Sequence, residues 1–417
     1  MIYRRKKYLD KIYKSLQTEK LVLLLGTRQV GKTTILEILQ KELEGSIYFY
    51  SFEDDFSMQE FNSKDEFLNY FKLSLGVNFF EDGYFLIDEF QYVKNGEQIL
   101  KSIYDDKNIK LKLVVTGSGL WTYNDENKGT LVGRGAEIFV YSFDFFEFLE
   151  YKGLNSSDLS FSDLSSSICS VIKPYMDEYL TFGGYPAVLN ANTKNEKIIE
   201  LEKIINRYLD RDINFFLDKD ELINFKKFFT FLNTQIGNLV KKEAIAEYLG
   251  IKLKYVEKYL NILEKTMFIS RVYPFFKDKS KEYSSLPKFY FSDIGILNFL
   301  EKSFDFRENN GKVIENFVYT ELLKNKLFNS DEIKVYKKLT KSEIDFVYDG
   351  MDLFIPIEVK SGNKKNTPKI FHFFEEDYGN KTSFYIMTNS NVIKKEKVSD
   401  KELFFIPNWF IGKMISK

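Results

Sequence analysis

Apolar and polar residues follow a regular block pattern in the first part of the chain. A continuous apolar run at residues 21–25 ends at Gly26, and from Thr33 apolar residues recur with the spacing of a one-sided helix. Further apolar runs with the length of buried strands occupy residues 47–52, 84–87, 111–116 and 137–140. Strands that alternate with helices predict an α/β fold with a parallel, doubly wound sheet over residues 1–152.

The pattern changes after a serine-rich segment at residues 155–170, which predicts a loop or a domain boundary. Residues 175–280 are expected to form a mostly helical domain. Residues 285–417 are mixed, so a third, α/β domain is expected there. Its strands are predicted at residues 343–348, 353–359 and 383–387.

Composition narrows the class of protein. No apolar run approaches the roughly 20 residues of a membrane span, and the basic start lacks the apolar core of a secretory signal, so a cytoplasmic protein without a membrane partner is expected. Lys plus Arg (60) and Asp plus Glu (61) nearly cancel. Any nucleic-acid site must therefore be a local patch.

Cysteine and histidine occur once each, as Cys169 and His372. These counts exclude an intramolecular disulfide and a cysteine-cluster zinc site, so a metal would need oxygen ligands, as Mg²⁺, Mn²⁺ and Ca²⁺ do. His372 lies among phenylalanines, where a packed side chain is the simpler interpretation. Neither residue is assigned a chemical role.

The segment GTRQVGKT at Gly26–Thr33 carries a nucleotide-binding pattern between a strand and a helix. Its glycines let backbone N–H groups turn around a polyphosphate, and the following helix directs its positive end to the same anion. Lys32 is predicted to reach the β and γ phosphates of ATP, and the Thr33 hydroxyl to ligate Mg²⁺. The residues predicted to bind ATP here are Gly26, Thr27, Arg28, Gln29, Val30, Gly31, Lys32, Thr33 and Thr34.

A strand that ends in two carboxylates strengthens this prediction. The apolar run at residues 84–87 ends in Asp88 and Glu89. Beside a phosphate-binding loop, Asp88 is predicted to lie near the Mg²⁺ ion and Glu89 to polarise an attacking water. Alone, such a strand end would be explained about equally well by ordinary solvated carboxylates.

Two weaker features complete the nucleotide site. Thr116 or Ser118, at the end of the strand VVTGS, is placed to sense the γ phosphate, although an ordinary strand-to-turn transition explains the residues equally well. Arg134 is a candidate to stabilise transition-state charge, within its own chain or in a neighbouring subunit. A surface arginine is the alternative.

Together these residues resemble a known family. GTRQVGKTT, FLIDEFQ, VVTGSG and LVGRGAEIFVYSFDFFEFL are similar to prokaryotic AAA-type ATPases that carry a carboxyl-terminal domain of unknown function. YLTFGGYPAVL, RDI at residues 211–213 and PKFYFSDIGI extend the resemblance over nearly the whole chain. It implies ATP binding and hydrolysis but no settled biological role.

The middle of the chain predicts a helix-turn-helix with a wing. Residues 238–250 form one helix, residues 251–263 a second, and residues 268–273 a wing strand, which also resembles the winged-helix segment of the same family. The second helix would expose Lys252, Lys254 and Lys258 to a phosphate backbone. Glu257 and Glu264 on that helix oppose this use, and a role in domain packing or protein binding stays open.

The last domain carries a second candidate site. Strand alternation places Glu358 and Lys360 on one face, and Asp345 projects from the preceding strand, an arrangement that can hold Mg²⁺ and orient water for phosphodiester attack. This resembles the PD-(D/E)xK nuclease motif. The resemblance implies a further glutamate on the helix at residues 311–326, with Glu315 preferred and Glu321 as the competing choice.

Basic segments at residues 334–338 and 364–365 flank these strands and are suited to a phosphate backbone. The leading hypothesis is an AAA-type ATPase that controls a nuclease-like domain acting on or binding DNA or RNA. A non-cleaving ATPase that binds protein or DNA, and a nucleotide-gated signalling protein, are the alternatives. A homo-oligomer is compatible with each of them.

Overall fold

The structure, a computed structural model, divides into two compact units. The first comprises Met1–Tyr141 with Lys265–Met267, and the second comprises Ser142–Glu264 and Phe268–Lys417. The residues described by the structure are 3–53, 59–118, 133–156, 158–276, 280, 282, 285–305, 310–325, 332–337, 342–350 and 353–415. Within these ranges, no helix combines the length and apolar character needed to cross a bilayer.

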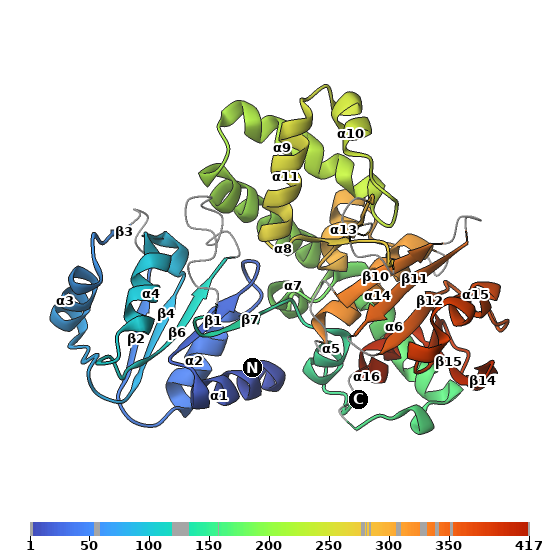
Figure 1. Cartoon of the computed structure of the whole chain (residues 1–417), viewed down its shortest axis with the longest axis horizontal. Coiled ribbons are helices and arrows are strands. Elements are labelled where there is room, and N and C mark those ends of the chain that lie inside the picture. The colour runs from blue at the N-terminus through green and yellow to red at the C-terminus, as the bar shows by residue number, and fades with distance from the viewer. Residues whose placement is uncertain are drawn as a thin grey trace. The chain divides into compact units, whose positions relative to one another are not determined.

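The first unit contains a five-stranded sheet in the order β2-β4-β6-β1-β7, and all its pairings are parallel, which confirms the predicted parallel sheet (Figure 1). The strands are β1 (Leu21–Leu25), β2 (Ile47–Ser51), β4 (Tyr84–Asp88), β6 (Lys112–Gly117) and β7 (Ala136–Phe139). The remaining elements are α1 (Lys6–Thr18), α2 (Lys32–Glu42), α3 (Lys64–Leu75), α4 (Gly96–Asp105), η1 (Phe90–Tyr92) and the paired short strands β3 (Gln59–Glu60) and β5 (Val93–Lys94). Every residue of β1 is buried, as expected for an apolar strand inside a parallel sheet.

Helices make up the first half of the second unit. They are α5 (Phe145–Tyr151), η4 (Phe161–Asp163), α6 (Ser166–Phe182), α7 (Pro186–Asn190), α8 (Lys194–Arg207), the π-helical η5 (Tyr208–Asp212), η6 (Ile213–Phe215), α9 (Lys219–Leu232), η7 (Asn233–Gln235), α10 (Lys242–Leu249) and α11 (Leu253–Lys265). Strands β8 (Ile269–Val272) and β9 (Lys288–Phe291) pair antiparallel after α11. The helix pair and following strand therefore occur where the sequence predicts them.

The second half of this unit contains a mixed six-stranded sheet in the order β10-β11-β12-β13-β15-β14 (Figure 1). The strands are β10 (Ile333–Lys337), β11 (Glu343–Asp349), β12 (Phe354–Val359), β13 (Tyr385–Asn389), β14 (Lys394–Val398) and β15 (Lys401–Pro407). The other elements are α13 (Ile294–Glu301), α14 (Gly311–Lys324), α15 (Lys369–Tyr378), η9 (Gly379–Lys381), η10 (Asn408–Phe410) and α16 (Ile411–Ile415). β11 and β12 are antiparallel, whereas β12, β13 and β15 run parallel, so the latter three end at one edge.

Contacts divide the chain near the first predicted boundary. The first compact unit ends at Tyr141, because the apolar face of α5 packs against Tyr179 and Phe317 of the second unit. The domain bounds 1–152, 175–280 and 285–417 stay predictions. The serine-rich segment is not wholly a loop. Its Ser165 hydroxyl caps α6 by accepting from the Ile168 N–H group, so the serines near this position start a helix.

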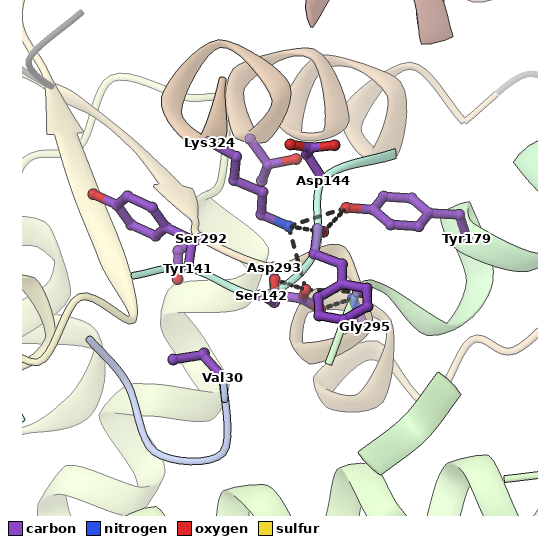
Figure 2. Close-up of polar contacts among 12 residues, drawn as sticks. Val30, Tyr141, Ser142, Asp144, Tyr179, Ser292, Asp293, Gly295 and Lys324 are labelled. Carbon is purple, nitrogen blue, oxygen red and sulfur yellow. Dashed lines mark hydrogen bonds and ion pairs between the residues drawn. The ribbon is translucent and has the colours of Figure 1, made fainter. Parts of the chain in front are cut away.

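A buried polar network holds the start of the second unit (Figure 2). Asp293, only 1% exposed, caps α13 by accepting from Gly295 N at 2.8 Å. Its other oxygen accepts from Ser142 Oγ at 2.5 Å and Gly184 N at 3.0 Å, and lies 3.5 Å from Lys324 Nζ. The carboxylate thus joins three segments that are distant in the sequence.

Lys324 and Glu321 extend this network along α14. Lys324 Nζ donates to Phe143 O at 3.2 Å and contacts the Tyr179 hydroxyl at 3.1 Å (Figure 2). Both carboxylate oxygens of Glu321 accept from Phe145 N, at 3.1 and 3.2 Å. Buried charges of this kind must be paired to persist, so Glu321 is a structural residue and the competing choice for the nuclease-like site is wrong.

Candidate functional site

The segment Gly26–Thr33 forms the predicted turn between β1 and α2. Gly31 has a φ of 96° at the start of α2, a left-handed conformation that favours glycine. A side chain at Gly26 would lie 2.2 Å from the Val140 carbonyl oxygen, so only glycine fits there. Lys32 is buried, and its ammonium donates to Gly26 O and Thr27 O at 2.9 Å each. The loop therefore holds the lysine beside its own carbonyl groups.

Asp88 lies at the carboxyl end of β4 and faces α2. Its Oδ2 atom accepts from the Thr33 hydroxyl at 2.8 Å, and its Oδ1 atom accepts from the Thr116 hydroxyl. Burial, followed by the neighbouring Glu89, raises the pKa of Asp88, although both hydroxyl hydrogen bonds oppose the shift. The sequence prediction that Thr33 and Asp88 form one site is consistent with this contact, and their oxygen atoms suit Mg²⁺.

Glu89 is buried and held by one side chain of the phosphate-binding loop and one that follows it. It has a φ of 55°, and its carboxylate lies 3.4 Å from the Arg28 guanidinium and accepts from the Gln91 amide. Gln91 also accepts from Ser118 N at 3.2 Å. Gln91 was not among the predicted site residues, although its place directly after the acidic pair was a signal in the sequence.

The two candidate phosphate sensors have different surroundings. The Thr116 hydroxyl is engaged by Asp88 and also accepts from Glu89 N at 3.0 Å. The Ser118 hydroxyl is buried and, among the described residues, has no hydrogen-bond partner. A buried polar group without a partner is costly, so Ser118 is the better placed of the two to bind a ligand.

Arg134 lies near the amino ends of the parallel strands, whereas the phosphate-binding loop lies at their carboxyl ends. It precedes β7, whose first paired residue Ala136 lies beside Val22 near the start of β1, and its guanidinium binds Asp105 at 2.9 Å. The loop that contains Lys32 follows the other end of β1. In this arrangement Arg134 is not beside the phosphate-binding loop, and its role toward the nucleotide, within its own chain or in a neighbouring subunit, stays a prediction.

A second group of charged residues lies on β11 and β12. The register pairs Phe346 with Ile357, and one step further along both strands Asp345 and Glu358 follow, on the same face. Asp345 accepts from Val359 N at 2.7 Å. Burial and then the Glu358 charge raise the pKa of Asp345 well above its usual range, and burial also raises the pKa of Glu358. The two carboxylates thus repel each other when both are ionised.

Lys360 shares this face and is paired to Glu358. Burial alone would lower the pKa of Lys360, but the carboxylates of Glu358, Asp345 and Glu315 outweigh burial and raise it. The side chain is consequently an ammonium ion at neutral pH. It is suited to orient or neutralise an anion rather than to accept a proton from water.

Glu315 of α14 is held by residues that the sequence prediction did not include. Its Oε1 atom accepts from the Tyr290 hydroxyl at 2.6 Å and from Lys288 Nζ at 3.2 Å. Lys288, 2% exposed, also contacts Glu343 at 3.2 Å. Burial lowers the pKa of Lys288, yet the carboxylates of Glu315, Glu343 and Asp345 raise it overall. The signal available in the sequence was a lysine, Lys288, at the start of an otherwise apolar strand.

The fit of this site to Mg²⁺ depends on two carboxylates. One oxygen of Glu358 is buried without a hydrogen-bond partner among the described residues, which leaves it suited to a cation. The predicted third ligand, Glu315, is occupied by Lys288 and Tyr290. In the described part of the chain, no group of three or more His, Cys, Asp or Glu side chains is arranged to hold a metal ion.

The lysines of α11 are less available than the sequence suggested. Lys258 is partly buried and binds both carboxylate oxygens of Glu221, at 2.8 and 2.9 Å. Lys252 and Lys254 are exposed, as predicted. Of the basic segments, Lys338 lies outside the described residues, and Lys334 is buried against Glu282 at 3.3 Å.

Comparison with known families agrees with the nucleotide site. Residues 18–149 match the family model of an AAA domain. Residues 173–307 and 310–407 match two different domains of unknown function, DUF8612 and DUF4143. The amino-terminal part is therefore a P-loop domain of the AAA type, and the match to the last part assigns no activity.

The similarity extends to whole chains that are described as uncharacterized proteins. The chain is 26% identical to the uncharacterized protein MJ1544 of Methanocaldococcus jannaschii, covering 94% of this chain and 87% of that one. An uncharacterized protein of Haemophilus influenzae is 24% identical, with 98% of each chain covered. Among solved structures, a Walker-type ATPase of Pyrococcus abyssi matches 72% of this chain and 96% of its own, with 17% identity and a TM-score of 0.47.

Proposed function

We propose that the protein is a Mg²⁺-dependent ATPase of the AAA type that controls a nuclease-like site acting on nucleic acid. The nuclease-like part of the proposal rests above all on one observation. Asp345 and Glu358 lie on one face of adjacent strands, and the Lys360 ammonium lies beside them. One buried oxygen of Glu358 has no hydrogen-bond partner within the described ranges. Carboxylates and a lysine in this combination suit a phosphodiester substrate.

The chain's own groups supply ATP binding in this proposal. The ammonium of Lys32 exchanges the Gly26 and Thr27 carbonyls for phosphate oxygens, and the Ser118 hydroxyl gains a partner. Mg²⁺ would supply charge neutralisation and orientation of the phosphates, held by Thr33 and Asp88. Glu89 orients water once it is released from Arg28 and Gln91.

The nuclease-like site works through fewer groups. Asp345 and Glu358 would hold Mg²⁺, which supplies an activated water and neutralises charge on the phosphate. Lys360 stays protonated and stabilises the anionic phosphate. Glu315 would join the metal ligands only if Lys288 moved away from it. The Lys288 ammonium therefore competes with a metal ion for the Glu315 carboxylate.

In this proposal, nucleotide control acts through a short series of contacts. Arg5 is 3% exposed and donates to the carbonyl of Val30 in the phosphate-binding loop at 3.0 Å and to that of Tyr141 at 2.6 Å. The next residue, Ser142, is held by Asp293 in the second unit. A movement of the loop on nucleotide binding would thus reach the peptide that connects the two units.

The experiment that tests the proposal combines both activities. Purified protein is incubated with labelled single-stranded, duplex and branched DNA and with RNA, in Mg²⁺ or Mn²⁺, with and without ATP. We expect cleavage that is lost in Asp345→Asn and that loses its ATP dependence in Lys32→Ala. Wild-type protein that hydrolyses ATP but cuts none of these substrates would contradict the nuclease-like role.

The rival function is a non-cleaving ATPase whose last two domains bind DNA or protein. The position of Lys288 favours it, because an ammonium already neutralises Glu315 and Glu343. In that case α10, α11 and the β8–β9 pair would act as a winged helix that contacts phosphate through Lys252 and Lys254. A homo-oligomer with Arg134 acting in a neighbouring subunit, and a cytoplasmic location, belong to both proposals.

A further inference from the structure

A pocket lies at the carboxyl ends of the parallel strands β12, β13 and β15. Its volume is about 120 Å³, and it is lined by the residues that follow each strand, with one side closed by α6 and by Ile314 of α14. Carboxyl ends of parallel strands are where α/β sheets bind ligands. Gly362, in the pocket wall, lies two residues after Lys360, so the pocket adjoins the nuclease-like site.

The rim of the pocket is fixed by hydrogen bonds between its loops. Ser390 N donates to Gly362 O at 3.2 Å, and Asn391 N donates to Asn363 Oδ1 at 3.0 Å. Asn408 Nδ2 donates to the backbone oxygen of Lys360 at 3.3 Å. The pocket is therefore formed before any ligand enters, which reduces the entropic cost of binding.

The lining combines one apolar side with amide groups and the ion pair of Lys173 and Asp177, whose charged atoms lie 3.4 Å apart. Met176, Leu180 and Trp409 are buried apolar side chains. Asn408 is only 4% exposed, and among the described residues its Oδ1 atom has no hydrogen-bond partner. A buried amide oxygen of this kind requires a donor. The ligand should therefore combine an N–H group with an apolar face.

Size limits the ligand to one ring. A cavity of roughly 150 Å³ accommodates benzene, so a pocket of about 120 Å³ suits a six-membered ring better than a fused pair. Pyrimidine bases combine such a ring with N–H and carbonyl groups on one edge, which asparagine amides can pair with. A base enters such a pocket only when it is unstacked.

We propose that this pocket binds a single unstacked pyrimidine base of a nucleic-acid strand whose backbone lies at Asp345, Glu358 and Lys360. The inference rests on the proposed function, since it names the substrate of the same site. It makes single-stranded, pyrimidine-containing nucleic acid the preferred substrate class. Fully paired duplexes and purine strands are disfavoured.

Cys169 lines the pocket and is the only cysteine of the chain, so it provides a probe that is independent of cleavage. The full chain is treated in EDTA with a small thiol-alkylating reagent, with and without labelled decamers of thymidylate or deoxyadenylate. We expect the thymidylate strand to bind at least tenfold more tightly and to slow alkylation of Cys169 at least fivefold. Ser390→Phe, which fills the pocket from its rim, should abolish the preference and the protection, and Asn391→Ala should weaken both without altering the core.

The outcomes separate this inference from the function on which it rests. Equal affinity for the thymidylate and deoxyadenylate strands, or equal rates of cutting, would overturn the pyrimidine pocket alone. Binding of thymidylate without protection of Cys169 would do the same. Protection by thymidylate without any cleavage in Mg²⁺ would support the pocket and contradict the nuclease. Wild-type protein that binds neither strand would overturn the pyrimidine pocket, and the nuclease-like role would fall as well only if none of the DNA and RNA substrates were cut.

Discussion

The two candidate sites hold their lysines in contrasting ways. In the phosphate-binding loop, Lys32 donates to carbonyl groups five and six residues away in the same short segment. On β11 and β12, Lys360 binds a carboxylate two residues away, while Lys288 arrives from a separate strand and binds Glu315 and Glu343. The printed hydrogen bonds of Lys32 go to neutral carbonyl groups, whereas Lys360 and Lys288 are each paired with a carboxylate.

This difference indicates how each site would respond to its ligand. Carbonyl groups are weak competitors for an ammonium, so the loop can release Lys32 to a phosphate at small cost. Carboxylates are strong competitors, so a cation entering the acidic site must displace Lys288 or share its partners. The nucleotide site is thus arranged for easy occupation, and the acidic site is restrained.

Replacing Lys32 should produce the largest effect, since nothing else in its loop carries a positive charge toward the phosphates except Arg28, which is paired with Glu89. We expect Lys32→Ala to lower ATP hydrolysis by roughly a hundredfold or more, measured as phosphate release. Lys41→Ala, at the exposed last turn of the same helix, is the matched control and should retain wild-type activity. Unchanged phosphate release by Lys32→Ala would refute the nucleotide-site assignment.

Removing Lys288 should make the acidic site easier for a metal ion to occupy. In Lys288→Met, Glu315 and Glu343 lose their cationic partner, so we expect Mg²⁺ to bind about tenfold more tightly, equivalent to ~1.4 kcal/mol. The measurement is the rise in Tm caused by added MgCl₂, which grows with affinity.

Lys334→Met provides the control for that measurement, since Lys334 is a similarly buried strand lysine paired with Glu282. It should leave the Mg²⁺ response unchanged. If Lys288→Met binds Mg²⁺ no better than wild type, Lys288 is not a competitor for the metal position.

The smallest effect concerns stability and pH. Because the pKa of Asp345 is raised in the folded chain, its ionisation destabilises the fold as the pH rises above the unfolded-state value of about 3.9 and toward the folded value. Asp345→Asn can still accept the Val359 hydrogen bond but carries no charge. We expect it to be more stable than wild type by about 1 kcal/mol at pH 8, with a smaller difference at pH 4.

Thermal unfolding in EDTA at both pH values measures this difference. Asp349→Asn, at the far end of the same strand, is the control and should show no comparable gain. If Asp345→Asn is instead less stable than wild type at pH 8, the ionised carboxylate stabilises the fold, and the prediction is wrong.

Much of the nucleotide site could be predicted from sequence, because its chemistry lies within contiguous motifs. Gly26–Thr33 and Asp88 are both read from a strand followed by a turn. The pairing of Asp345 with Glu358 followed from side-chain alternation. By contrast, Lys288 lies 27 residues from Glu315 and 55 from Glu343, and no local periodicity reports a contact over such distances.

Other features could not be placed from the sequence, for similar physical causes. Arg134 looks like a catalytic arginine in its glycine-flanked loop, but the loop precedes its strand and therefore lies at the amino edge of the sheet. Glu321 and Glu315 occupy the same helix, and only the tertiary fold shows that the former binds the Phe145 N–H group. The end of the first unit at Tyr141 has no compositional break to mark it.

The buried network around Asp293 also bears on how the chain is made. Ser142 and Phe143 are held by partners 151 and 181 residues further along the chain. At roughly 5–20 residues per second, a ribosome would need about 10–35 s to deliver Lys324 after Phe143. During that interval the amino-terminal P-loop domain can fold, while the partners of the connecting peptide have not yet been synthesised. Synthesis halted before Lys324 would therefore leave that peptide accessible to proteases, beside a domain that is already complete.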